Sequence, residues 1–252
     1  MTDSHIHLGE FANGLYFTPE YLAEWKNQNR DIQKFLFIQT ARSGDFDSAY
    51  ADFLKGADKL QELAGSCALP ALWLSLDAFK NCKKYFKDEF VAFKFHPRVE
   101  SNLSDNDFDY VMKVSAEFNR PLIIHTSYDG AESCGRLTPI CKKNPNTTII
   151  LAHGRPFEEC PNALKLPNVY ADTAYMPPAE AKEIVNQGLG DKLLFGSDFP
   201  IDKYFYPEEN EFLRYQEFKT QMQNVLPKCA LSGNFHKLFC NGITKESDRV
   251  KK

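Results

Sequence analysis

Short apolar runs recur along the chain, and each is followed by a longer segment in which apolar residues have helical spacing. The runs are nearly continuous in Ile, Leu, Val and Phe instead of alternating with polar residues. Strands that are covered on both faces show this pattern, which is typical of a parallel sheet. Seven such runs are present: Phe35–Thr40, Ala68–Leu76, Phe90–His96, Pro121–Thr126, Thr147–His153, Asn168–Thr173 and Lys192–Asp198.

The segment Met1–His7 adds an eighth strand, although it carries few apolar side chains. We expect this first strand to be very short or trimmed at the chain terminus. The segments between the runs place apolar residues three and four positions apart, as amphipathic helices do. The predicted helices are Phe46–Ala64, Asp105–Phe118, Glu132–Lys143, Pro178–Gly188 and Glu208–Val225.

Eight strands that alternate with helices predict an α/β fold, namely a closed (β/α)8 TIM barrel. The length of 252 residues fits one such barrel, so we expect a single domain over residues 1–252. An open doubly wound sheet is the alternative. It needs a Gly-rich phosphate-binding turn after an early strand, and the sequence has none.

Composition excludes several classes of partner. The net charge is −4, which gives no electrostatic reason to expect a nucleic acid or an anionic membrane. No apolar run approaches the ~18 residues of a membrane span, and the N-terminus does not resemble a secretory signal. The seven cysteines form no Cys-x-x-Cys pair and are interpreted as reduced thiols. We therefore expect a cytoplasmic protein with a small-molecule substrate, and we allow for a homodimer.

Histidines and one aspartate gather at the C-terminal ends of the predicted strands. In a barrel these ends meet at one face, where the βα loops build the active site. His5 and His7 lie two residues apart on a strand, so both point to one face and suit a shared metal ion. A buried carboxylate such as Asp198 is costly unless it is paired or bound to a metal. The full set is His5, His7, His96, His125, His153 and Asp198.

Four short motifs follow one another along the chain. They are Asp3-Ser4-His5-Ile6-His7, Ile124-His125-Thr126, Leu151-Ala152-His153-Gly154 and Phe195-Gly196-Ser197-Asp198-Phe199-Pro200. Together they resemble the amidohydrolase superfamily, and most closely its amidohydrolase-related branch of metal-dependent hydrolases. The segment Ser232–Phe239 is similar to the closing helix of that family, so the resemblance covers nearly the whole chain.

The resemblance implies a barrel that holds one divalent metal, most commonly Zn²⁺, with Mn²⁺ as the alternative. His5, His7 and His125 match the nitrogen ligands of the family, and Asp198 matches its carboxylate ligand. Asp198 and His153 match the positions that act in catalysis. The implied reaction is the hydrolysis of a small, carboxylated amide, ester or lactone by a metal-activated water.

Three other functions remain open at this point. A nonoxidative decarboxylase uses the same scaffold, and the sequence does not separate it from a hydrolase. A phosphoesterase or nuclease ranks lower, because such families use extra acidic ligands where this chain has Lys94 and His96. A barrel that keeps its ligands but serves only as a metal-binding scaffold is the alternative that is not an enzyme.

Further residues are expected to line the pocket. Lys94 and His96 share one face of the fourth strand. Some superfamily members carry a carboxylated lysine there, so a binuclear site with a modified Lys94 is a minority option; otherwise Lys94 binds substrate or extends to the barrel mouth. Arg98 and Arg155 follow strands directly, and guanidinium groups suit carboxylates. The predicted substrate-binding set is Lys94, His96, Arg98, Arg155 and Tyr175.

Overall fold

The structure is a computed structural model, and it describes residues 1–11, 14–39, 46–87 and 89–240. Nine strands form one sheet in the order β2-β1-β3-β4-β5-β6-β7-β8-β9. All neighbours from β1 to β9 in this order pair in parallel, whereas β2 pairs with β1 as an antiparallel edge strand. The strands are β1 Thr2–Glu10, β2 Tyr16–Phe17, β3 Lys34–Gln39, β4 Ala68–Trp73, β5 Ala92–Phe95, β6 Leu122–His125, β7 Ile149–Ala152, β8 Val169–Asp172 and β9 Leu193–Leu194.

The eight predicted parallel strands are confirmed, and one expectation about them is wrong. The first strand is not short: β1 spans nine residues and is the longest of the described strands. It tolerates polar residues because Asp3, Ser4 and His5 find hydrogen-bond partners inside the molecule. The sequence did not predict β2. The second predicted strand ends at Thr40, which lies outside the described residues.

The segment that follows β9 joins it to β1. The amide of Ser4 donates to the carbonyl of Phe195 at 2.9 Å, and the amide of His7 donates to that of Phe199 at 2.8 Å. In the opposite direction, the amide of Asp198 donates to the carbonyl of His5 at 2.8 Å. We call this pairing of residues 3–8 with residues 195–199 the seam. It closes the sheet into a barrel and excludes the open doubly wound alternative.

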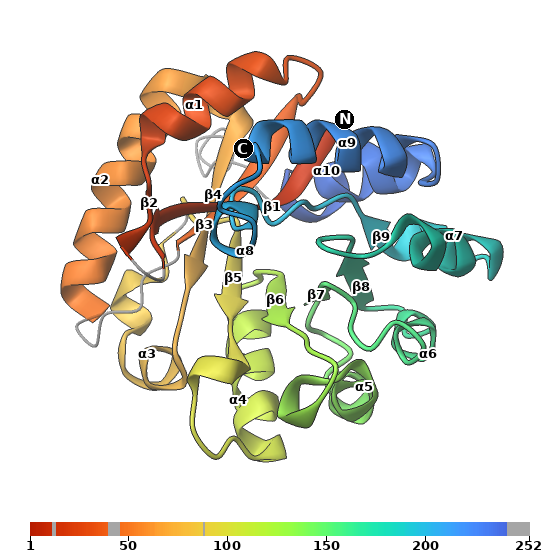
Figure 1. The fold of residues 1–252 in the computed structure, drawn as a ribbon. Coiled ribbons are helices and arrows are strands. Elements are labelled where there is room, and N and C mark those ends of the chain that lie inside the picture. Colours follow the sequence, from red (N-terminus) through yellow and green to blue (C-terminus); the bar gives the residue numbers. More distant parts are fainter. Residues whose placement is uncertain (12–13, 40–45, 88, 241–252) are drawn as a thin grey trace, which may run out of the picture.

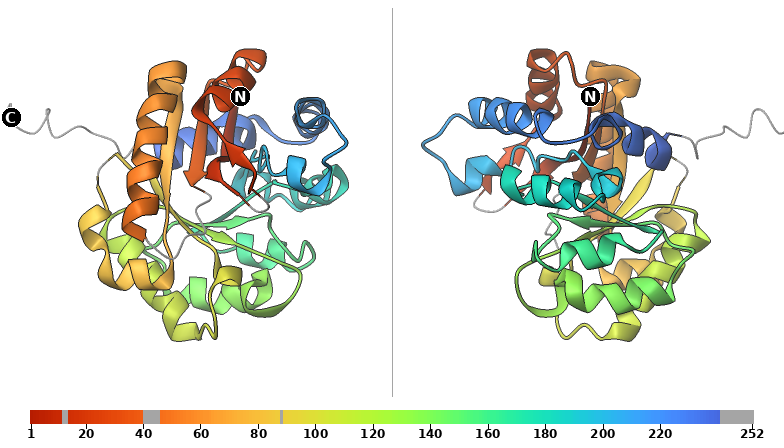
Figure 2. Two further views of the ribbon diagram at one scale, coloured as in Figure 1. Left: turned by 60° about the vertical axis from the view of Figure 1, so that its left-hand side comes forward. Right: turned by 90° about the vertical axis from the view of Figure 1, so that its right-hand side faces the viewer.

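Helices surround the strands (Figure 1). In two further views, α4 and α5 lie on the opposite side of the strands from α1 and α9 (Figure 2). The five predicted helices are confirmed to within a few residues at their ends, and α10 occupies the position of the closing helix that the family resemblance implied. The helices are α1 Pro19–Gln28, α2 Phe46–Ala64, α3 Leu76–Asn81, α4 Asp105–Glu117, α5 Cys134–Lys143, α6 Cys160–Leu164, α7 Pro178–Asn186, α8 Asp202–Phe205, α9 Glu211–Gln223 and α10 Asn234–Phe239.

Several single helical turns connect these elements. They are 3-10 turns at Gly65–Cys67, Lys83–Tyr85, Pro97–Val99, Gly130–Glu132 and Gly190–Lys192, and a π turn at Cys229–Gly233. Among the described helices, none is both long enough and apolar enough to cross a membrane. All seven cysteines are free thiols.

Strand residues alternate between two apolar clusters. Phe35 and Phe37 of β3 face the helices, whereas Leu36 and Ile38 join a second cluster that Phe235 and Phe239 of α10 complete. This alternation follows from the two-residue period of a strand. Toward the carboxyl ends of β5, β6 and β8, the positions that continue the second cluster become polar. They are Lys94, His125 and Asp172, which follow Ala92, Ile123 and Tyr170 by two residues.

Candidate metal centre

The seam brings the two first-strand histidines against Asp198. The Asp198 Oδ1 atom lies 3.0 Å from His5 Nε2 and 2.8 Å from His7 Nε2, and all three side chains are buried. Burial raises the pKa of Asp198, but His5 and His7 outweigh burial and hold this pKa well below its ordinary value. Asp198 is therefore a buried anion with two imidazole nitrogens directed at one of its oxygens.

Gly196 makes this close approach of the two chain segments possible. A Cβ atom at this position would lie 3.0 Å from the Cβ of Asp172, 3.0 Å from the Oγ of Ser4 and 3.1 Å from the Cβ of His5. Real Cβ contacts are seldom this short, so a larger residue would push β1 away from Asp198. The glycine of the Phe195–Pro200 motif thus acts by its lack of a side chain.

Asp172, at the end of β8, orients His5, and the sequence analysis missed it. Its Oδ2 accepts a hydrogen bond from His5 Nδ1 at 2.9 Å, while its Oδ1 accepts from the backbone amide of His153 at 2.9 Å. Burial raises the pKa of Asp172, but its contacts, of which His5 is the strongest, lower this pKa to about 2. Because Nδ1 of His5 is occupied, its Nε2 is the nitrogen that faces Asp198. A carboxylate behind a ligating histidine fixes the tautomer of the imidazole in this way.

His153 and His125 form a directed pair. His153 Nδ1 lies 3.2 Å from the carbonyl oxygen of Ala174, which only accepts, so this nitrogen carries the proton. His153 Nε2 then accepts from His125 Nδ1 at 3.1 Å, which leaves Nε2 of His125 as an acceptor. These tautomers are assigned from the hydrogen-bond network. Burial lowers the pKa of His153 to about 3, so its imidazole is neutral at neutral pH.

The donor set fits a divalent metal. One ligand atom each from His5, His153 and Asp198 lie within 4.8 Å of one another, and all three residues are buried. Burial also lowers the pKa of His7 to about 4, so this imidazole is neutral as well. Burial lowers the pKa of His5 too, but Asp198 and Asp172 outweigh burial and hold this pKa above its ordinary value, so His5 gives up a proton when it ligates. Neutral imidazoles with a carboxylate are ligands that Zn²⁺ accepts. Two predicted ligands, His7 and His125, are not among the three: His7 Nε2 contacts Asp198 Oδ1, and His125 lies beside the group through its bond to His153.

Lys94 points at the centre and is fully buried. Its Nζ lies 3.3 Å from His5 Nε2, so the alternative in which Lys94 extends to the barrel mouth is wrong. The physical reason is that Lys94 lies on the inner face of the short strand β5, with Asp172 and Asp198 close enough to stabilise its charge. Burial is the larger effect and lowers the pKa of Lys94 to about 8.

His96 belongs to a column of stacked rings. Its ring lies 3.9 Å from the ring of His125, with 14° between their planes, and 5.2 Å from the ring of Trp73, with 10° between their planes. The His96 imidazole is thus stacked with both rings, and it is partly buried. In this arrangement His96 supports His125, a role that the sequence analysis did not anticipate.

Arg155 is a cation near the centre that lacks an ion-pair partner among the described residues. Its guanidinium lies 5.3 Å from the ring of Tyr128 and 5.8 Å from the ring of Tyr175, and its Nε atom is buried. Within the described part of the chain, no carboxylate forms an ion pair with Arg155. Arg98 is instead exposed on the turn Pro97–Val99. The geometry therefore supports Arg155 over Arg98 as a carboxylate-binding residue.

Three residues of the site adopt a left-handed backbone conformation. Their φ angles are +71° for His153, +56° for Tyr175 and +63° for Asp198. Such angles are unfavourable for residues other than glycine, and they cluster at functional sites where the surrounding structure holds them. Only two other described residues that are not glycine share this conformation, Asn102 and Asn119. The chain is therefore strained where it presents its candidate catalytic side chains.

The chain belongs to the amidohydrolase family. The family model described as "Amidohydrolase" matches residues 3–239, which include every residue of the centre described above. The predicted family and barrel fold are thereby confirmed, and the protein is an enzyme of this superfamily. No curated protein matches the chain by sequence.

Solved structures share the fold at low sequence identity. A probable 2-pyrone-4,6-dicarboxylic acid hydrolase from Acinetobacter baumannii, with citric acid bound, has a TM-score of 0.68 and 13% identity, covering 94% of this chain and 98% of that chain. Dihydroorotase from Campylobacter jejuni has a TM-score of 0.61 and 15% identity, and the match covers 97% of this chain and 84% of that chain. The IDCase of Metarhizium anisopliae has a TM-score of 0.61 and 12% identity, and the match covers 89% of this chain and 79% of that chain.

Proposed function

We propose that the protein is a metal-dependent hydrolase that acts on a small carboxylated amide, ester or lactone. The observation that carries this proposal is the convergence of His5 Nε2 and His7 Nε2 on one oxygen of Asp198, at 3.0 and 2.8 Å. These three residues would hold the ion, which we propose is Zn²⁺, with His153 or His125 supplying a further nitrogen. When bound, the ion supplies Lewis acidity that activates water toward a carbonyl carbon. We further propose that the protein works in the cytoplasm.

The residues around the ion divide the remaining work. Asp198 keeps a low pKa and is the anion positioned to accept a proton from the attacking water. His153 is neutral, with Nδ1 at the Ala174 carbonyl and Nε2 accepting from His125 Nδ1, so the two imidazoles form a pair through which a proton can be relayed to or from the reacting group. Arg155 lacks a carboxylate partner among the described residues, and a substrate carboxylate would meet that need.

A nonoxidative decarboxylase is the second candidate. It is supported by the same guanidinium of Arg155, which has no carboxylate partner in the described part of the chain, because a decarboxylase must also bind a substrate carboxylate beside its proton-transfer residues. Release of carbon dioxide from a carboxylated substrate would establish this reaction in place of hydrolysis.

Metal removal and a single substitution test the proposal. The chelated protein and the Asp198→Asn variant should each lose at least about a hundredfold in the rate of hydrolysis of dicarboxylated lactones and cyclic amides, as expected when a group that transfers protons is lost. Added Zn²⁺ should restore the wild-type protein but not the variant. The metal content of both proteins, measured by mass spectrometry, gives a readout that does not depend on the substrate.

The control is Asp58→Asn, which neutralises an exposed carboxylate on α2 far from the centre. It should keep both the metal content and the rate of the wild type. Full hydrolytic activity after complete chelation would refute the proposal.

A further inference from the structure

The turn His153–Arg155 follows β7 and carries two of the side chains on which the proposed chemistry depends. Its first two residues, His153 and Gly154, have left-handed backbone angles, with φ of +71° and +61°. This conformation is unfavourable for a histidine, so the surrounding structure has to hold the turn in place. The contacts of the turn backbone therefore decide where the Arg155 guanidinium is presented.

The hydroxyl of Thr126 contacts the backbone at both ends of this turn. Thr126 directly follows β6, and it is fully buried. Its Oγ1 donates to the carbonyl of Ala152 at 2.6 Å and accepts from the amide of Arg155 at 2.8 Å. One side chain thus joins the residue before His153 to the residue that is expected to bind a carboxylate.

Cys134 holds the other polar group of the Arg155 backbone. The amide of Cys134 donates to the carbonyl of Arg155 at 2.8 Å, and the thiol of Cys134 is hydrogen-bonded to the hydroxyl of Thr126. Arg155 is therefore held at its amide by Thr126 and at its carbonyl by Cys134. A buried amide that loses its partner costs free energy, so the backbone keeps this place while both contacts are present.

Close packing around Gly154 restricts the turn further. A Cβ atom at this position would lie 2.9 Å from Cε of Met176 and 3.1 Å from Sγ of Cys160. From β8, Asp172 accepts a hydrogen bond from the amide of His153 at 2.9 Å. The turn after β7 is thus held from both neighbouring strands, by Asp172 on β8 and by the hydroxyl that follows β6.

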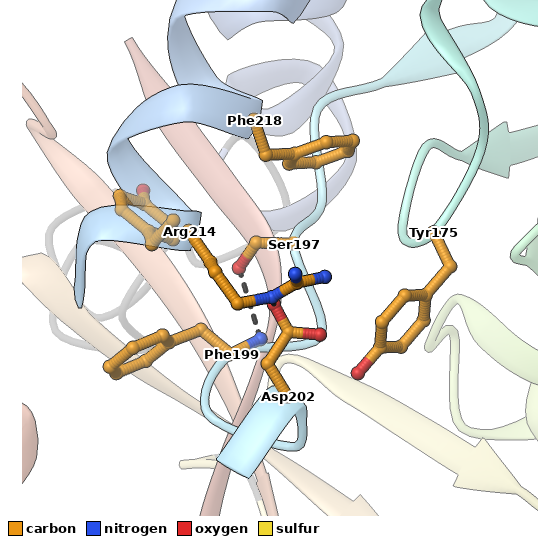
Figure 3. Close-up of a pocket in the computed structure, with 7 residues that line it drawn as sticks. Tyr175, Ser197, Phe199, Asp202, Arg214 and Phe218 are labelled. Atoms are coloured by element: carbon orange, nitrogen blue, oxygen red, sulfur yellow. Dashed lines mark hydrogen bonds and ion pairs between the residues drawn. The ribbon is translucent and has the colours of Figure 1, made fainter. Parts of the chain in front are cut away.

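A second residue with a left-handed backbone has a hydroxyl contact of a different kind. Oγ of Ser197 accepts from the amide of Phe199 at 3.1 Å and so spans Asp198, whose φ is +63° (Figure 3). This bond joins residues two positions apart and acts within one chain segment. The bond from Thr126 to Ala152 spans 26 residues instead, so it fixes the turn relative to a neighbouring strand.

We propose that Thr126 is a positioning residue, whose hydroxyl fixes the Arg155 guanidinium in the place where it binds a substrate carboxylate. Thr126 acts through the backbone of Arg155 and does not touch the substrate. Without the hydroxyl, the amide of Arg155 loses its partner, and the turn has to shift to find another one. This inference rests on the proposed function, because it assumes that Arg155 binds a carboxylate.

Three substitutions of Thr126 test the role of the hydroxyl. The probe is glutarate, and its binding to the zinc-loaded full chain is measured by titration calorimetry. Thr126→Val keeps the shape of the side chain but removes the hydroxyl, and it should weaken glutarate binding about tenfold, as expected when a buried amide loses its partner. Thr126→Ala removes the same hydroxyl without the bulk of valine and should show the same loss. Thr126→Ser keeps the hydroxyl and should bind within about twofold of the wild type.

Thr147→Val is the matched control. Thr147 is also buried, and its hydroxyl donates to the carbonyl of Met112 at 2.8 Å. It precedes β7 by two residues and so lies at the opposite end of this strand from the turn. The control should lower the melting temperature as Thr126→Val does, while its affinity for glutarate stays within about twofold of the wild type.

A double-mutant cycle with Arg155→Ala separates positioning from a general loss of stability. Arg155→Ala should weaken glutarate binding at least about tenfold, and adding Thr126→Val should weaken it by less than about twofold more, because Thr126 acts through Arg155. Additive losses, equal losses in Thr126→Val and Thr147→Val, or folded hydroxyl-free variants that bind like the wild type would overturn the proposal and leave the carboxylate function standing. If the wild type does not bind glutarate, or Arg155→Ala binds it equally well, the carboxylate assignment fails and the positioning role fails with it.

Discussion

Asp172 holds three parts of the centre at once. It accepts hydrogen bonds from His5 Nδ1 at 2.9 Å and from the amides of His153 and Ala174 at 2.9 and 3.1 Å. We predict that Asp172→Asn lowers zinc affinity about ten- to a hundredfold, because the charge behind His5 raises the basicity of this ligand. Competition with a chelating dye measures the affinity. A variant that binds zinc as tightly as the Asp58→Asn control would contradict this role.

The sequence predicted most residues of the candidate site but not Asp172. Histidines at strand ends are conspicuous because they are few and because the barrel brings those ends together. The position of Asp172 against His5 spans 167 residues of chain, and no spacing pattern encodes such a distance.

At the scale of elements, helix α4 begins with a reciprocal cap. The Oγ of Ser104 accepts from the amide of Asp107 at 3.3 Å, and the Asp107 carboxylate accepts from the amide of Ser104 at 3.0 Å. Ser104→Ala should lower the free energy of unfolding by about 1 kcal/mol, as the loss of an N-cap does. Urea unfolding measures the change. Ser101→Ala, at an exposed position just before the cap, should change the stability by less than about 0.5 kcal/mol.

A helix could be predicted from the sequence where its apolar residues keep helical spacing over several turns. The prediction of Phe46–Ala64 agrees with α2 at both ends. Helix α1 was not predicted, although Thr18 caps it and Pro19 is its first residue. Half of its ten residues are polar, so no apolar stripe stands out in the sequence. Its buried residues include Trp25, which stacks against Phe199 of the seam, so tertiary packing stabilises α1 more than its own pattern does.

Across the whole molecule, Glu211 joins distant parts of the chain. It accepts hydrogen bonds from the hydroxyl of Tyr21, 190 residues earlier, and from Lys203 Nζ at 2.9 Å. Burial raises the pKa of Glu211, but Tyr21 and Lys203 outweigh burial, so this pKa lies below its ordinary 4.5. A carboxyl whose pKa is lower in the folded state stabilises the fold above pH 4.5 and loses this contribution as the pH falls through the folded pKa.

We therefore expect Glu211→Gln to be less stable than the wild type at pH 7, with a difference that shrinks below pH 4.5 as the wild-type carboxyl takes up its proton. Unfolding in urea at a series of pH values measures this difference. Glu217→Gln, at an exposed position of the same helix, is the control and should match the wild type throughout. A difference between Glu211→Gln and the wild type that grows as the pH falls would contradict the sign.

The seam has a consequence for the order in which the barrel opens. His5 and His7 lie on one side of the seam and Asp198 on the other. An ion bound by all three would therefore link the two ends of the sheet. Opening the seam would then require release of the ion, which adds the free energy of binding to the cost of opening. Zinc should slow hydrogen exchange at the amides of Ser4, His7 and Asp198 while leaving the local fraying of α4 unchanged.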